Sequence, residues 1–454
     1  MKNGTSFARR PVSWRLAAAC VALSGMALPV WSLDLTQAYR AASENDASIR
    51  AARAAAEAGR ERLPQAVAQQ RPNVSLNAAR NHNDLTSRTQ NLLGQPVTNQ
   101  NQYYSGSQTL SVRQPLYRPY LSALVRQAQA QVEDADATLE RDEHALVTRV
   151  AEAYFDVLLA GDQQALVAAQ KKNYAVQLDA ARKGFMAGSG TRTDVDEAQA
   201  RLDLTLAQEL ETQQNVEFTR RRLEVLVGGP LDTLAVLDVA RFVPNAPVPA
   251  SVDAWIERAE QASPELASLR AQMEATRLEI EKAQAGHKPT LDLVAQWSRT
   301  NSDSVTSVNS RYDNKTIGLQ LSVPLYAGGG VSSSIRQAVA AHERAREVLE
   351  AARRDLGVRV HREFRGITEG VLRIAALEQA VRSAEQAVTS NRQSFRAGMR
   401  TTLDVLNAEQ QKTVALRDLA QARYVYLLSR LRLQSLAGEG REDIVAEINA
   451  WLAP

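Results

Sequence analysis

Apolar residues recur along two long stretches of the chain at the spacing of a coiled coil. After Leu121 the steps between apolar positions are mostly four and three residues, and in the second half they recur at every seventh position. This pattern predicts long helices that each pack along one face. The positions are Leu121, Val125, Ala128, Val132, Ala135, Leu139, Leu146, Val150, Ala153 and Val157, and then Ile367, Ile374, Val381, Val388 and Phe395.

Alanine also recurs beside the first of these stripes. A second flank of small residues lets a helix pack against neighbours on two sides, as the staves of a tube do. An ordinary coiled coil in which alanine serves only helix propensity is the alternative, and this pattern leaves it open. The alanines are Ala123, Ala130, Ala137 and Ala145.

Shorter stretches alternate strictly between apolar and polar residues, which is typical of β-strands. Leu291, Leu293 and Trp297 oppose Asp292 and Gln296, and a second such stretch follows around Leu319 and Leu321. The equivalents in the first half are Val74, Leu76 and Ala78, then Leu110 and Val112. We predict strand pairs over about 72–115 and 289–324, of the length that a tilted membrane strand needs. Polar loops are predicted around 84–102 and 302–314.

The chain has the same order of signals twice. Pro115 in the first strand exit corresponds to Pro324 in the second, and Asp194 after the first glycine turn corresponds to Asp404, both about 210 residues apart. We predict a tandem repeat, with repeat 1 over 33–230, a proline-rich linker over 231–250, repeat 2 over 251–440 and a C-terminal segment over 441–454. Helical hairpin turns are predicted at about 184–194 and 395–404.

The first residues are typical of a secretory signal peptide. Lys2, Arg9, Arg10 and Arg15 precede an apolar run from Leu16 to Val30, and small Ser32 suits a cleavage site. We predict a signal peptide over 1–32, with a short transmembrane anchor as the alternative. Its removal changes the formal net charge from +3 to −1, which argues against nucleic acid as a partner.

The cysteine content and the lengths of the apolar stretches argue against a disulfide-stabilised protein and against a helical membrane protein. The single cysteine, Cys20, lies in the predicted signal peptide, so we expect no disulfide and no cysteine zinc site in the mature chain. No later stretch is apolar for long enough to form a membrane-spanning helix.

Four strands per chain cannot close a barrel in lipid, so membrane strands would require a homo-oligomer, with eight strands from two chains or twelve from three.

At this point the residues resemble the TolC family of outer-membrane channel proteins over essentially the whole mature chain. The motifs that carry the resemblance are Ala283–Leu293 entering a strand, Val323–Gly329 leaving one, and Phe395–Ala408 at a helical hairpin. The resemblance implies a mainly α-helical protein with membrane β-structure. It would be a homotrimer with a long coiled-coil tube in the periplasm and one shared transmembrane β-barrel in the outer membrane of a Gram-negative bacterium.

The resemblance also implies a periplasmic aperture that contacts among hairpin-tip residues hold nearly shut. The matching positions are Thr193 and Asp194 in the first hairpin and Phe395 and Arg400 in the second, with Asp404 and Asn407 facing the pore. Phe395 replaces a tyrosine of other members, and Asn407 replaces a second pore aspartate of some members. From the residues alone, an aspartate near a helix start is more often a capping or first-turn charge.

We find no catalytic constellation. The glycine-rich stretch 327–334 lacks the lysine of a phosphate loop, and the histidines are scattered, so we expect no enzyme and no cofactor or metal.

The function we predict is the passive outer-membrane duct of a tripartite export system for proteins (type I secretion) or small molecules. Its partners would be a periplasmic adaptor, an inner-membrane ABC exporter or proton-driven pump, and outer-membrane lipid. The alternative is a periplasmic coiled-coil adaptor.

Overall fold

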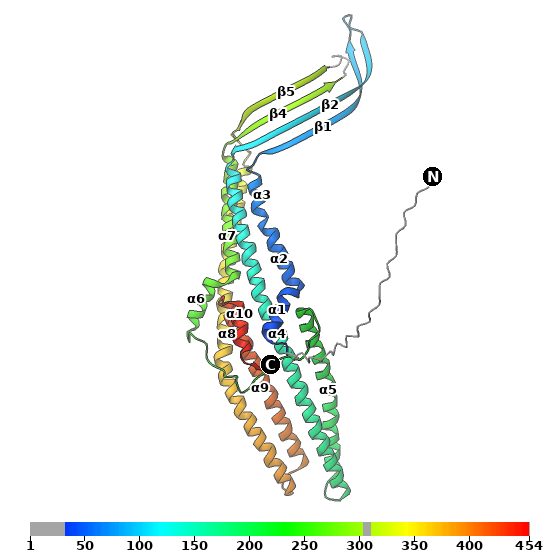
Figure 1. Ribbon diagram of the computed structural model, residues 1–454, viewed down its shortest axis with the longest axis vertical. Helices are drawn as coiled ribbons and strands as arrows, with labels where there is room; N and C mark the ends of the chain where they lie inside the picture. Colours follow the sequence, from blue (N-terminus) through cyan, green and yellow to red (C-terminus); the bar gives the residue numbers. More distant parts are fainter. Residues whose placement is uncertain (1–31, 303–309, 454) are drawn as a thin grey trace, which may run out of the picture.

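The computed structural model describes residues 32–302 and 310–453 as a tall molecule with a β-sheet at one end and two helical hairpins at the other (Figure 1). The predicted signal peptide lies outside the described residues except for Ser32, and the predicted second polar loop lies partly outside them. Within the part of the chain that the structure describes, none of the helices carries a stretch long and apolar enough to cross a membrane.

Helices account for most of the described chain, and strands occur in two separate groups. The helices are α1 (Leu35–Asn45), α2 (Ala47–Arg60), α3 (Arg62–Ala68), α4 (Pro119–Met186), α5 (Arg192–Val227), α6 (Val252–Ala262), α7 (Pro264–Gln284), α8 (Gly330–Arg396), α9 (Thr402–Leu436) and α10 (Arg441–Asn449), with a short 3-10 turn, η1 (Ala285–His287). The strands are β1 (Asn73–Gln90), β2 (Pro96–Tyr117), β3 (Val236–Leu237), β4 (Thr290–Ser302), β5 (Ser310–Ser322) and β6 (Leu452–Ala453).

The large sheet is antiparallel with the strand order β1-β2-β4-β5, so the two predicted strand pairs join through β2 and β4. Its two faces differ. One face is apolar and exposed, because Leu76 pairs with Leu110, Leu110 with Trp297, and Leu293 with Leu319. Leu319 keeps 66% of its surface exposed. The other face carries small polar side chains, such as Ser75 and Ser111, whose hydroxyls lie 2.7 Å apart.

The prediction of a polar loop over 84–102 was wrong. β1 continues to Gln90 and β2 begins at Pro96, so only the turn from Asn91 to Gln95 connects them. Polar residues can pair as strands here because the backbone supplies the ladder hydrogen bonds on its own. β5 likewise begins at Ser310, inside the second predicted loop. The β1–β2 ribbon therefore extends beyond β4, whose pairing with β2 ends at Ser105.

An ion pair joins the sheet to the helices below it. Asp292 on β4 has a side chain that is only 5% exposed, and Arg118, between β2 and α4, donates from Nε to its Oδ1 at 2.7 Å. The second nitrogen of Arg118 pairs with the other carboxylate oxygen, and Arg113 lies 3.8 Å away. A forked pair of this kind fixes the relative orientation of the two side chains as well as the distance between them.

The alanine flank of α4 does bring a second neighbour close. Ala130 packs with Ala275 and Leu278 of α7, while lower on α4 Leu178 packs with Ala198 of α5. Ala123 and Ala137 are buried, but Ala145 is exposed, so the second flank ends before it. In the second half, Ile367, Ile374 and Val388 are buried and Val381 and Phe395 are half-buried.

Most of the core lies at mid-height, where α1, α6 and α10 pack beside α4, α8 and α9 (Figure 1). The proline-rich linker folds into this region. Its β3 pairs with β6 near the C-terminus, and the single Tyr154 hydroxyl proton is shared between the Ala235 and Leu33 carbonyl oxygens, at 2.8 and 3.0 Å. The two ends of the described chain and the linker are thus held together at one level.

Candidate functional site

Two hairpin tips form the end of the molecule that lies farthest from the sheet (Figure 1). In the first, α4 ends at Met186 and Gly188 adopts a positive φ of 72°, which glycine tolerates best. Thr191 then caps α5. Its hydroxyl accepts from the Asp194 N–H at 3.1 Å, and the Asp194 carboxylate accepts from the Thr191 N–H at 2.9 Å. This reciprocal capping box fixes the first turn of α5.

The second tip repeats this arrangement. Gly398 has a φ of 75°, Thr401 caps α9, and the Asp404 carboxylate accepts from the Thr401 N–H and hydroxyl, both at 2.9 Å. Arg400 lies 3.5 Å from Asp404 in the same hairpin. Asp194 and Asp404 therefore both serve as first-turn capping groups, which is what the residues alone favour.

Hydrogen bonding lowers the pKa of both tip carboxyl groups. For Asp194 the Thr191 hydroxyl and N–H contribute most, and the Thr402 hydroxyl of the second tip adds a smaller effect. For Asp404 the Thr401 N–H and hydroxyl lower the pKa, with Arg400 adding an attraction between charges. Hydrogen bonds to the ionised form favour it, so both groups remain carboxylates in mild acid.

The other predicted tip residues have fewer partners. Thr193 is exposed in the first turn of α5, and Phe395 is half-buried near the end of α8. Arg400 is more than half exposed and pairs with Asp404. Thr402 of the second tip adds to the lowering of the pKa of Asp194, whereas Arg400 forms its ion pair with Asp404.

One arginine that the sequence did not single out bridges the two hairpins. Arg201 of α5 donates from Nη2 to the Asn407 side-chain oxygen of α9 at 3.0 Å, and its other nitrogen contacts Gln410. Asn407 is otherwise exposed. Because Arg201 follows Asp194 by seven residues, the two lie on the same face of α5, and this spacing is the signal that could have indicated Arg201.

Apolar and buried polar contacts support this bridge. Leu406 of α9 is fully buried against Tyr174, Leu178 and Ala198 of the first hairpin. Next to it, the buried Glu409 pairs with Arg392 of α8 and accepts from Asn173 of α4 at 3.3 Å. The two hairpins therefore meet through an apolar centre with charged contacts around it.

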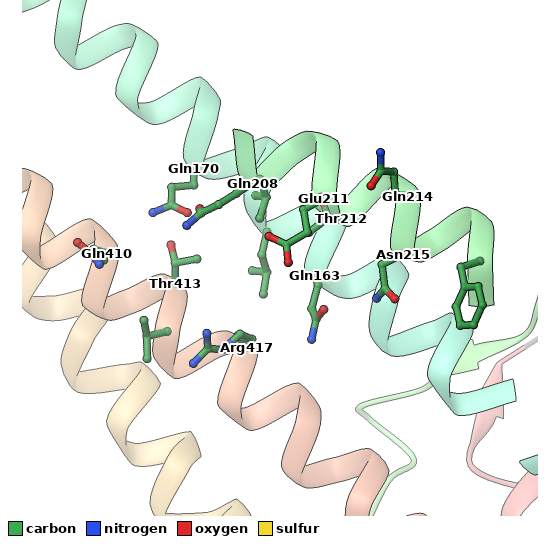
Figure 2. A pocket seen from close by; sticks show the side chains of 14 residues that line it. Gln163, Gln170, Gln208, Glu211, Thr212, Gln214, Asn215, Gln410, Thr413 and Arg417 are labelled. Carbon is green, nitrogen blue, oxygen red and sulfur yellow. The ribbon is translucent and has the colours of Figure 1, made fainter. Parts of the chain in front are cut away.

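A groove of 660 Å³ with mixed polar and apolar lining lies above these contacts, between the α4–α5 pair and α9. Figure 2 shows amide side chains from all three helices directed into it, with Arg417 on the α9 side. Amide groups both donate and accept hydrogen bonds without carrying charge, so this wall suits contact with water or a polar surface. The labelled lining residues are Gln163, Gln170, Gln208, Glu211, Thr212, Gln214, Asn215, Gln410, Thr413 and Arg417.

Comparison with known proteins decides the family. The family described as "Outer membrane efflux protein" matches residues 38–229 and 255–439, which include both tips and the large sheet. The chain belongs to the outer membrane efflux protein family. Membership also confirms the resemblance to TolC and does not favour the adaptor alternative.

Relatives of this outer membrane efflux protein cover nearly the whole chain. The alkaline protease secretion protein AprF of Pseudomonas aeruginosa is 36% identical over 95% of this chain and 89% of its own. The outer membrane protein TolC of Vibrio cholerae is 31% identical over 95% of this chain and 96% of its own. In fold, the chain is similar to the crystal structure of VceC from Vibrio cholerae, with a TM-score of 0.75 and 21% identity over 89% of this chain and 96% of that one.

These findings confirm the predicted localisation and function class. The protein is an outer-membrane component of a secretion or efflux system, and it extends into the periplasm. Its relatives are channel proteins rather than enzymes.

Proposed function

We propose that three copies of this chain share one twelve-stranded barrel and one helical tube, with the tandem repeat supplying two equivalent staves per chain. The supporting observation is the sheet itself, whose outer strands β1 and β5 each pair on one side only within the described chain. Unpaired backbone groups cannot face lipid, so those strands need partners from other copies. Eight strands would give a barrel filled by side chains, whereas twelve leave room for a passage.

The tips form the periplasmic aperture of this duct. Thr193, Asp194, Phe395 and Arg400 line its closed form, and Asp404 and Asn407 face the pore. Their position at the end opposite the sheet and the contacts between the two hairpins support this assignment. Phe395 cannot donate the hydroxyl hydrogen bond that a tyrosine would, so closure relies on the arginine and threonine contacts.

The cargo is a secreted protein that crosses by a type I route. The name of AprF, an alkaline protease secretion protein that aligns with 95% of this chain, supports a protein cargo. Energy comes from an inner-membrane ABC exporter, and a periplasmic adaptor connects that exporter to the tips. The duct itself performs no chemistry.

Assembly is tested first. The mature protein, purified in a mild detergent and measured by light scattering, is expected to be a trimer that dissociates only on heating. A monodisperse monomer would contradict the duct. Cargo is then tested by expressing the protein with an exporter and adaptor that secrete a protease, in cells that lack their own duct. Protease in the medium supports the protein route, and restored dye efflux without protease contradicts it.

A further inference from the structure

The apolar face of the large sheet ends in a basic and aromatic rim on the side away from the helices. Beyond the level of Trp297, this face carries Arg80, Arg299 and Arg311, with Tyr104 next to Arg80. The opposite face at the same level carries uncharged residues such as Asn81, Ser105 and Thr300. The basic residues therefore lie on the face that meets lipid and are absent from the described residues of the polar face at that level.

Aromatic residues mark both limits of this face. Tyr117 lies on it at the end of β2 next to the helices, and Tyr104 lies on it 13 positions earlier in the same strand, at the level of the rim. At about 3.3 Å per residue and a tilt of about 45°, this distance covers about 30 Å along the membrane normal, the thickness of the hydrocarbon layer. The arginines thus lie where the outward-facing lipid head groups begin.

The rim contains a hollow that fits a small anionic group. Its volume is 600 Å³, and Arg80, Tyr104, Gly106, Arg299 and Asn301 line it. Register places Gly106 opposite both Arg80 and Asn301. A β-carbon added at Gly106 would meet only the Ala79 carbonyl oxygen, at 3.6 Å, so the space above this glycine is open.

The two arginines differ in how they are held. The Arg80 guanidinium lies 5.3 Å from the centre of the Tyr104 ring, and in the described chain no carboxylate pairs with it. Arg299 lies 5.4 Å from the centre of the Trp297 ring and pairs with Asp313 at 2.9 Å. Aromatic contacts position both guanidinium groups without neutralising them. Arg80 therefore stays available to an anion, whereas Arg299 shares its charge with Asp313.

We propose that this hollow binds the phosphate of a phosphorylated glycolipid of the outer leaflet, with its acyl chains along the apolar face below. Guanidinium groups form forked, charge-assisted hydrogen bonds with phosphate, and Asn301 and Gln108 can bond to sugar hydroxyls. The inference rests on the membrane position assigned to the sheet under the proposed function. It adds a lipid-recognition site that orients each protomer in the outer leaflet.

The test uses the detergent-purified trimer, titrated with bisphosphorylated lipid A and followed by native mass spectrometry. Arg80→Gln combined with Arg299→Gln should weaken retention about tenfold or more, since two charge-assisted contacts are lost. Asp313→Asn should strengthen it, because a competing carboxylate is removed. Arg88→Gln, farther out on β1, serves as the matched control and should change nothing. Equal retention by the parent and the double variant would overturn the proposal.

Two further arms guard against misfolding and general anion binding. Gly106→Val fills the hollow without changing charge and should also weaken retention, while each variant is first checked for a heat-modifiable trimer. Dephosphorylated lipid A and phosphatidylglycerol should both bind the parent more weakly than bisphosphorylated lipid A. If phosphatidylglycerol binds as well, the glycolipid assignment is wrong. A parent that is no trimer contradicts the proposed function instead, and that outcome is seen before any lipid is added.

Discussion

At the scale of single residues, the two tips show how one side chain can hold two roles. Asp194 and Asp404 cap their helices through equivalent threonines, Thr191 and Thr401, and this is a local role that needs no other hairpin. Capping also fixes where each carboxylate lies and keeps it ionised. A capped aspartate is therefore a suitable fixed charge for a narrow aperture.

We predict that Asp404→Asn lowers the cation selectivity of the channel without altering trimer stability. Three carboxylates around a narrow axis would focus an attractive field on cations. Reversal potentials across a salt gradient in planar bilayers measure this. Unchanged potentials would show that Asp404 has only its capping role.

The parent channel, with Asp404 in place, should keep its cation preference in mild acid. Capping lowers the pKa of Asp404 below its ordinary value of 3.8, and this opposes the increase that crowding of like charges produces. A group with a lowered pKa stays charged above that value and loses its charge only as the pH falls through it. Reversal potentials at about pH 5 should match those at neutral pH.

Arg201 is predicted to hold the aperture closed. Its contacts with Asn407 and Gln410 connect α5 to α9, so Arg201→Ala should favour the open form by about tenfold per protomer, seen as higher conductance in planar bilayers. Arg192→Ala is the matched control, because Arg192 pairs with Asp196 of its own helix. Equal conductance of the Arg201→Ala channel and the parent would contradict this role.

At the scale of elements, connections decide how strands and helices are aimed. The glycines at 188 and 398 let each helix reverse within a few residues. At the other end, the chain passes from β2 into α4 beside Arg118, whose pairing with Asp292 of β4 ties two strands and one helix together. The first connections are local, whereas the last depends on residues 174 positions apart.

We predict that Asp292→Asn destabilises this junction by about 2 kcal/mol, because it breaks a buried ion pair whose arginine is partly exposed. The midpoint of heat-induced trimer dissociation should fall accordingly. Asp313→Asn removes a carboxylate from the exposed ion pair with Arg299 on the same sheet and should leave the midpoint nearly unchanged. Equal midpoints for the Asp292→Asn variant and the parent would show that the pair adds nothing to the junction.

At the scale of the whole molecule, stability concentrates at mid-height, where the linker and both ends of the described chain meet the long helices. Asp34 near the N-terminal end accepts from Asn449 at 3.2 Å, and β3 pairs with β6. His144 of α4 is buried nearby, with its Nδ1 3.5 Å from the Ser435 hydroxyl. This region ties the two halves of the chain together between the sheet and the tips.

His144 should make this region sensitive to acid. Burial lowers its pKa below the ordinary 6.5, Arg441 adds to the effect, and Glu143 opposes it. The unfolded chain then binds more protons just below pH 6.5, so stability falls as the pH drops from that value through the folded pKa. His144→Gln should flatten this dependence in thermal unfolding, while His361→Gln, at an exposed position, should not. An unchanged slope for His144→Gln would exclude His144 as its source.

The sequence by itself determined the features that depend on neighbours in the chain. The seven-residue spacing indicated the long helices, alternation indicated the sheet, and glycine turns followed by an aspartate placed both tips, because coiled-coil faces, strand faces and turns are local patterns. The resemblance in the motifs then gave the family. Over 84–102 the residues are mostly polar and do not alternate, so the sequence did not indicate strands there. Backbone hydrogen bonds between β1 and β2 extend the sheet in this stretch without an apolar pattern.

Only the tertiary structure decided which distant residues meet. Pairing of β2 with β4, the Arg118 contact with Asp292 and the bridge from Arg201 to Asn407 each join residues more than a hundred positions apart. The sequence contains many residues that could pair with a given arginine, and several strands that could pair with a given strand edge. The choice among them depends on how long helices pack and how strands align, and these are properties of the folded chain.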